Sequence, residues 1–160
     1  MFLKLKNWNE AAKQVQSWKN QGLEVVFTNG CFDILHFGHI AYLQEAKAKG
    51  DKLVIGLNSD ASVQILKGKH RPINDQKSRI AILDSLSFVD LVVLFEEETP
   101  LALITLLVPD ILVKGGDYTI DKIVGANIVL ENGGQVLSLQ FVEGYSTTNL
   151  EQKIIAHAKK

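Results

Sequence analysis

The chain has 160 residues, of which 46% are hydrophobic and 22% are charged, as in an ordinary globular protein. With a formal net charge of −1, the chain has no overall positive charge that would attract nucleic acid. Any attraction for a nucleotide must therefore come from a local cluster of cationic side chains. The single cysteine, Cys31, excludes an intrachain disulfide, and no apolar run has the length of a membrane span. Residues 1–160 are therefore predicted to be one cytoplasmic domain, without a nucleic-acid or membrane partner.

Residues 7–20 are predicted to form the first helix, because Trp8, Ala11, Val15 and Trp18 recur at helical spacing. Gly22 marks its end. The helix precedes the first predicted strand, so residues 1–22 are interpreted as an added element. We expect it to pack on a sheet edge or against a partner subunit, and we expect a homodimer or higher homo-oligomer.

Many of the candidate functional residues lie in a predicted strand-to-helix turn over residues 28–39. It follows an apolar run at residues 24–27, which predicts a buried strand. It leads into a helix whose apolar face is predicted to contain Phe37, Ile40, Leu43 and Ala46.

Two histidines, His36 and His39, lie three positions apart at the start of this helix. Residues three apart share a helix face, and their side chains lean toward the N-terminus, where free N–H groups and the helix dipole favour anions. The pair could be ordinary polar residues of a half-exposed helix. Its register after a strand favours a phosphate site with two added hydrogen-bond donors.

A second buried strand is predicted over residues 52–57, and Asp60 follows it. Ligands of open α/β sheets bind beyond the carboxyl ends of the strands, so Asp60 could bond a sugar hydroxyl. It could also be the N-cap of a helix that starts near residue 61, and the two roles are compatible.

The segment from Lys67 to Arg71 carries the densest positive charge, and Gly68 and Pro72 mark it as a loop. It could be a solvated surface loop. However, two histidines cannot balance a triphosphate, so Lys67 and Arg71 are predicted to supply positive charge, with Lys69 as a third candidate.

The next segments are predicted to be a helix over residues 78–85, a strand over 89–95 and a helix over 101–107. Arg79 would face either the site or the solvent, and Thr99 with Pro100 is predicted to start the third of these segments. A short strand over residues 110–113 then leads to Lys114-Gly115-Gly116-Asp117. The adjacent glycines could form a plain turn. Their position at the carboxyl end of a strand instead favours a segment whose backbone lies close to another group, such as a ligand.

The C-terminal part is predicted to contain a helix over residues 124–130, a strand over 135–139 and a last helix. Thr148 and Glu151 have capping-box spacing, and Ser146 and Thr147 would offer amides and hydroxyls to an anion. The apolar face of the last helix would be Leu150, Ile154, Ile155 and Ala158. This alternation predicts an α/β fold, a Rossmann-like parallel five-stranded sheet with helices on both faces.

The segment from Asn29 to His39 resembles the G-x-F-D-x-x-H-x-G-H signature of the cytidylyltransferase-like nucleotidyltransferases. The resemblance implies the HxGH type of this fold and transfer of a nucleoside monophosphate from a triphosphate to a phosphate-bearing acceptor. Longer matches resemble the D-glycero-β-D-manno-heptose 1-phosphate adenylyltransferases, which also occur as half of a bifunctional kinase/adenylyltransferase. They lie at residues 58–60, 66–68, 71–74, 113–118 and 141–148.

This second resemblance implies that ATP and a heptose 1-phosphate give ADP-heptose and pyrophosphate for lipopolysaccharide core synthesis. Relatives that use CTP typically carry Arg-Thr where this chain has Phe141-Val142, which favours adenine. A Mg²⁺ ion is expected, bound mainly through the ATP phosphates and not by a protein cage. Another acceptor, such as glycerol 3-phosphate or pantetheine phosphate, and a non-catalytic nucleotide-binding module are the alternatives.

Residues and resemblance together give a set of candidate site residues. The catalytic candidates are His36, His39, Lys67 and Arg71. The nucleotide-binding candidates are Asn29, Gly30, Cys31, Phe32, Gly38, His39, Lys114, Gly116, Asp117, Val142, Ser146 and Thr147. The acceptor-binding candidates are Asp33, Asp60, Lys67 and Arg71, although Asp33 could instead order the turn.

Overall fold

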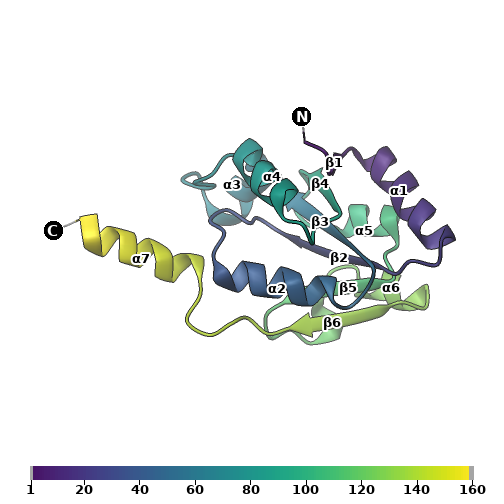
Figure 1. Ribbon diagram of the computed structural model, residues 1–160. Helices are drawn as coiled ribbons and strands as arrows, with labels where there is room; N and C mark the ends of the chain where they lie inside the picture. Colours follow the sequence, from purple (N-terminus) through teal and green to yellow (C-terminus); the bar gives the residue numbers. More distant parts are fainter. Residues whose placement is uncertain (1, 159–160) are drawn as a thin grey trace.

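The computed structural model describes residues 2–158. Six parallel strands form one sheet in the order β1-β4-β3-β2-β5-β6 (Figure 1). The strands are β1 (Leu5–Lys6), β2 (Val25–Gly30), β3 (Lys52–Asn58), β4 (Leu91–Phe95), β5 (Ile111–Gly115) and β6 (Gln135–Leu139). The parallel α/β prediction is confirmed, but the count of five strands is wrong. The sixth is β1, which pairs with the edge of β4.

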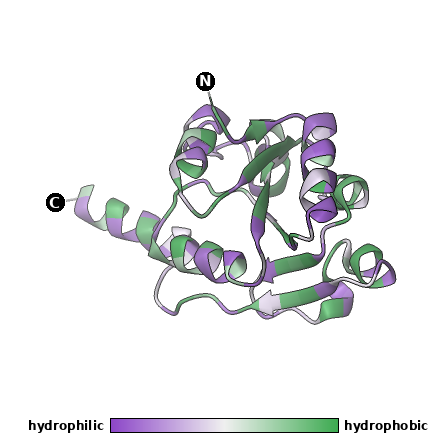
Figure 2. Ribbon diagram, turned by 45° about the vertical axis from the view of Figure 1, so that its right-hand side comes forward, coloured by the Kyte–Doolittle hydropathy of each residue, from purple (hydrophilic) through white to green (hydrophobic). Residues whose placement is uncertain are grey.

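Helices cover both faces of the sheet. They are α1 (Trp8–Asn20), α2 (Phe37–Lys47), α3 (Asp60–Lys67), α4 (Gln76–Ser85), α5 (Leu101–Leu107), α6 (Ala126–Glu131) and α7 (Thr147–Ala158), with a 3₁₀ turn, η1 (Ile120–Lys122). Buried residues of α1, α5 and α6 pack with one another on one face, and buried residues of α2 and α4 pack on the other. Figure 2 shows the strands as the most hydrophobic segments, as expected for strands buried on both faces.

The leading helix belongs to this core. Ala11 and Val15 of α1 are buried in the cluster that contains α5, and Trp8 and Trp18 pack against it. Its apolar face is therefore covered by the chain itself. The reason for placing a partner subunit on this helix no longer holds, and self-association stays a prediction.

Three predicted helix starts differ from the structure. Ser59, not Asp60, caps α3, because its hydroxyl accepts a hydrogen bond from the Ser62 N–H at 3.2 Å. Pro100 is the N-cap of α5 without a side-chain bond, so Thr99 is not the cap. The Ser146 hydroxyl accepts from the Asn149 N–H at 3.0 Å at the start of α7, two residues before the predicted capping box.

The buried face of α2 also differs from the predicted one. Gly38, Tyr42, Leu43 and Ala46 are the buried residues, whereas the Phe37 side chain is 57% exposed. The Phe37 ring instead packs against Tyr145, with 5.0 Å between centroids. Phe37 begins the helix beyond the sheet edge, where there is no sheet beneath it.

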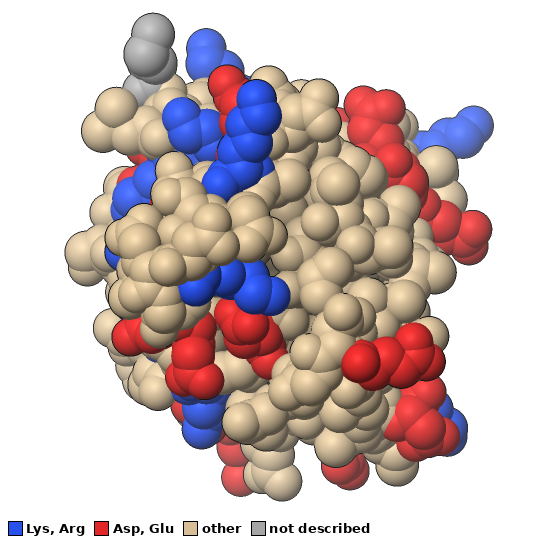
Figure 3. Space-filling view, turned by 90° about the vertical axis from the view of Figure 1, so that its right-hand side faces the viewer, with Lys and Arg blue, Asp and Glu red and all other residues tan. Residues whose placement is uncertain are grey.

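Opposite edges of the sheet differ in chemistry. At the amino edge Lys19 pairs with Asp110, and Lys47 and Lys52 both pair with Asp90. Figure 3 looks at this side and shows charges of both signs next to one another. The carboxyl edge carries α7, which extends away from the body (Figure 1). β2 lies between β3 and β5, so the crossovers reverse direction there, and this is the switch point where ligands of such sheets bind.

Candidate active site

Two cavities open at the switch point. The first, of about 140 Å³, contains His39 and is called the histidine cavity. The second, of about 330 Å³, contains Tyr118 and is called the tyrosine cavity. Both are lined by Asn29, Gly30, Cys31 and Lys114, at the ends of β2 and β5. A ligand in one cavity would therefore meet a ligand in the other at these residues.

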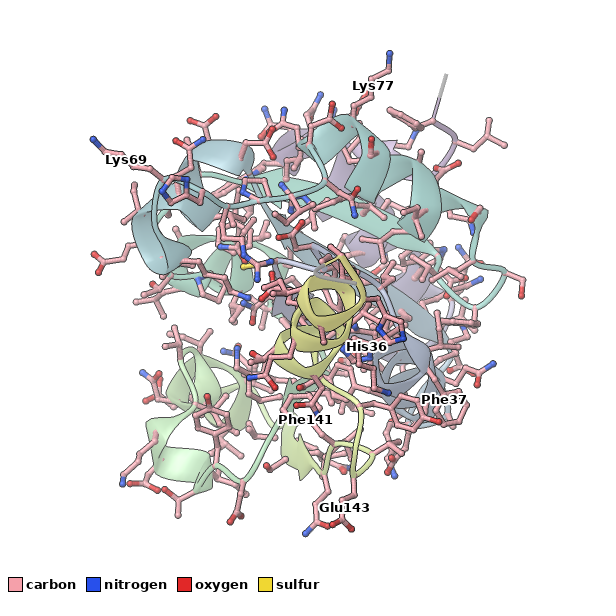
Figure 4. The ribbon with its side chains drawn as sticks, turned by 90° about the vertical axis from the view of Figure 1, so that its left-hand side faces the viewer. His36, Phe37, Lys69, Lys77, Phe141 and Glu143 are labelled. Carbon is pink, nitrogen blue, oxygen red and sulfur yellow. The ribbon has the colours of Figure 1, made fainter. Side chains whose placement is uncertain are left out.

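The two histidines come together as predicted. Their ring centroids are 4.0 Å apart, with 36° between the ring planes. His36 is the N-cap of α2 and His39 lies in its first turn. A side chain at Gly38 would approach the His36 ring to 3.1 Å, so the glycine leaves room for this imidazole. His36 lies beside α7 in Figure 4, which looks at the carboxyl edge.

Burial keeps both imidazoles neutral. Burial lowers the pKa of His36, and burial together with the neighbouring His36 and Lys67 lowers the pKa of His39 to about 4. The Nδ1 atoms of both rings are buried and have no hydrogen-bond partner among residues 2–158. Unpartnered buried polar atoms cost free energy, so a ligand that bonds these rings would be stabilised.

Binding of a polyphosphate should draw a proton into this pair. A triphosphate beside His39 raises the pKa of the imidazole, so at pH 6 the complex should hold more protons than the free protein. Titration calorimetry of ATP in buffers with different ionisation enthalpies should therefore show net proton uptake. His39→Asn should lose most of this uptake while His157→Asn keeps it. Equal enthalpies in all buffers would contradict protonation of the pair.

Two lysines bring positive charge to the histidine cavity. Lys67 lies at the end of α3 and Lys114 near the end of β5, and both line this cavity. Neither makes an ion pair within residues 2–158. Burial lowers the pKa of Lys114. Lys67 is exposed, whereas Lys114 is partly buried without a counter-ion, which favours an anionic ligand at this point.

Arg71 is engaged by carboxylates. Its Nη1 donates to Asp33 at 2.7 Å, and its Nη2 pairs with Glu151 of α7. Asp33 also accepts from the N–H groups of Ile73 and Asn74, at 2.9 and 2.8 Å. These bonds and Arg71 lower the pKa of Asp33 despite its burial. Asp33 thus ties its own turn to the loop after α3.

Lys69 and Asp60, unlike Lys67 and Lys114, do not line the histidine cavity. Lys69 is exposed and points outward, away from the histidines (Figure 4). The Asp60 carboxylate accepts from Nη2 of Arg79 at 2.8 Å, and the Asp60 backbone N–H donates to Oε1 of Gln76 at 3.2 Å. One oxygen of the Asp60 carboxylate is therefore bound to Arg79 and helps to hold the segments around the site together.

Arg79 is the site residue whose role the sequence did not reveal. Its side chain is completely buried, neither facing the site nor the solvent. It donates to the carbonyl oxygens of Cys31 and Asn58, at 2.7 and 2.8 Å, and to the Asn74 carbonyl at 3.1 Å. With Asp60, it ties together the segments that follow β2 and β3 and the start of α4.

The adjacent glycines are approached by aromatic rings. A side chain at Gly115 would come within 2.6 Å of the Phe141 ring, which lines the histidine cavity. A side chain at Gly116 would come within 2.9 Å of the Tyr118 ring, which lines the tyrosine cavity. Gly116 also has φ +116°, a conformation that other residues rarely adopt. Together the two glycines admit one ring to each cavity.

The remaining candidates are divided between the cavities and their surroundings. Phe32 and Thr147 line the histidine cavity, and Ser146 lines a neighbouring hollow of about 390 Å³ that also contains His36. Val142 and Asp117 line neither of these spaces. Within residues 2–158, no cluster of His, Cys, Asp or Glu is arranged to hold a metal ion. No helix of that part is long and apolar enough to cross a membrane.

The chain is similar to known proteins over most of its length. It is 57% identical to the bifunctional protein HldE of Mesorhizobium japonicum over 148 residues, which is 92% of this chain and 30% of that protein. It is 52% identical to HldE of Magnetococcus marinus over 153 residues, covering 96% and 31%. The chain thus spans about a third of the length of these curated relatives.

Solved structures agree with the fold. The lipopolysaccharide core biosynthesis protein of Thermoplasma volcanium is 34% identical with a TM-score of 0.60, over 78% of this chain and all of that one. A pantoate-β-alanine ligase of Francisella tularensis is 15% identical with a TM-score of 0.61, over 98% and 79%, and shares the fold. A family model described as cytidylyltransferase-like matches residues 27–153, so the chain belongs to the cytidylyltransferase-like family.

Proposed function

We propose that the protein is an adenylyltransferase that joins AMP from ATP to D-glycero-β-D-manno-heptose 1-phosphate. An oxygen of the acceptor phosphate attacks the α-phosphorus of ATP. The bond from this phosphorus to the oxygen that bridges to the β-phosphate breaks, and pyrophosphate leaves with its electron pair. The products are ADP-heptose and pyrophosphate, and both substrates are soluble molecules of the cytoplasm.

The paired imidazoles carry this proposal. Two imidazole rings lie 4.0 Å apart at the switch point near Lys67 and Lys114, and their buried Nδ1 atoms have no partner in the described part of the chain. The identity of more than half of the residues to HldE proteins supports the same assignment. The name HldE says only that those relatives are bifunctional, so the choice of heptose rests on the family resemblance.

The residues would act by position and charge. The acceptor phosphate is already an anion, so no strong general base is needed, and the difficulty is to bring two anions together. His36 and His39 would donate to phosphate oxygens, and Lys67 and Lys114 would neutralise their charge. Arg71 stays a candidate phosphate ligand that would have to exchange one of its carboxylates for a substrate.

A magnesium ion would be held by the substrate. Asp33, the carboxylate of the histidine cavity, is occupied by Arg71 and by two backbone N–H groups. This agrees with an ion held mainly by phosphate oxygens and water. When bound, the ion would neutralise part of the triphosphate charge.

A pyrophosphate-release assay tests the proposed function. We expect release from ATP with heptose 1-phosphate, and at least about tenfold less from CTP, because Phe141 and Val142 replace the Arg-Thr of relatives that use CTP. The acceptor panel includes mannose 1-phosphate, glycerol 3-phosphate and pantetheine phosphate. Release with CTP in place of ATP would overturn the choice of adenine. Release only with a different acceptor would overturn the choice of heptose.

A further inference from the structure

The tyrosine cavity lies on the opposite side of the sheet from the histidines. Its wall contains Leu112 and Ile123, which belong to the core cluster of α1, α5 and α6. The histidine cavity contains Phe32 and Tyr42, which belong to the cluster of α2 and α4. The two cavities share the end of β2 and Lys114, so they could hold two substrates that react between them.

The tyrosine cavity is lined by one carboxylate, Glu98, and by two cations, Lys114 and Lys122. Glu98 lines the cavity, is exposed and makes no ion pair within residues 2–158. Its carboxylate is a strong acceptor for hydroxyl groups. The volume of about 330 Å³ is at the small end of the range for ligand pockets, roughly 300–1,000 Å³.

Tyr118 gives this cavity a flat apolar wall. Its ring lies against the backbone of Gly116, where a methyl group would approach it to 2.9 Å, and its side chain is 48% exposed. The Tyr118 N–H also donates to the Ser138 hydroxyl at 3.3 Å, which links this residue to β6. An aromatic face beside a carboxylate suits a ligand with apolar C–H groups and several hydroxyls.

We propose that the tyrosine cavity binds the sugar part of the acceptor, with Glu98 bonding its hydroxyl groups and Tyr118 packing against its ring. The acceptor phosphate would then lie at Lys114, where the cavities meet, and would point toward the α-phosphate of a nucleotide in the histidine cavity. This inference rests on the proposed function and adds the residues that select the acceptor.

The experiment compares Glu98→Gln and Tyr118→Ala with the native protein. We expect each substitution to raise the KM for heptose 1-phosphate roughly 10- to 100-fold, while the KM for ATP stays within about twofold. Glu96→Gln is the matched control, because Glu96 is also exposed, lies two residues away and does not line the cavity. It should leave both KM values unchanged.

Calorimetric binding of heptose 1-phosphate alone separates this inference from the proposed function. Binding to the native protein that is weakened in both variants supports the acceptor site, even if the native protein shows no turnover and the proposed function fails. No binding to the native protein, or equal binding to all variants, overturns it. A rise in the KM for ATP in place of the acceptor would assign the cavity to the nucleotide and also overturn the inference.

Discussion

His39→Ala should lower the rate of pyrophosphate release about 100- to 1,000-fold, as expected for removal of one donor to the charge that develops in the transition state. The dissociation constant for ATP should change by less than about tenfold, because Lys67, Lys114 and the backbone N–H groups remain. Steady-state kinetics and ATP titration of the same preparation provide both numbers.

The comparison of the two numbers separates an enzyme from a binding module. A module without turnover would lose ATP affinity only, and that result would contradict catalysis by the pair. His157→Ala is the matched control, because His157 lies on exposed α7 and its ring contacts the carbonyl of Lys153 at 2.8 Å. It should leave turnover unchanged. Thermal unfolding of both variants excludes a general loss of structure.

The sequence was sufficient where local patterns determine the structure. β6 and α5 occupy the predicted residues, and the histidine pair was placed correctly by its register at a helix start. In these segments apolar spacing alone identifies the element. The position of a residue near the carboxyl end of a parallel strand was equally informative, because Lys114 lines both cavities at the switch point.

The sequence was insufficient where the partner of a residue is distant in the chain. β1 is two residues long, too short for any periodicity, and is a strand because β4 offers an edge. Glu98 and Tyr118 are 20 positions apart, yet the tertiary fold brings both to one cavity. Arg71 and Glu151 are 80 positions apart, so no local pattern could indicate their ion pair.

Arg79→Ala should lower the free energy of unfolding by about 3–5 kcal/mol, because it removes a completely buried side chain and leaves carbonyl oxygens without a donor, at about 1–3 kcal/mol each. The substitution leaves the Asp60 carboxylate without its cation and the carbonyls of Cys31 and Asn58 without a donor. Urea unfolding at pH 7 measures the loss. Arg79→Lys should recover only part of it, because an ammonium group cannot reproduce the planar fork that reaches both carbonyls and the carboxylate.

Lys77→Ala is the control for Arg79→Ala, since Lys77 is on the same helix and points outward (Figure 4). Its effect should stay within about 0.5 kcal/mol, as for ordinary surface substitutions. A loss below about 1 kcal/mol for Arg79→Ala would contradict the role of Arg79 in holding together the segments that follow β2 and β3. Because Arg79 holds the segments after β2 and β3, which both cavities share or border, Arg79→Lys should also weaken binding of ATP and of the acceptor together. Substitutions inside one cavity should weaken only one of them.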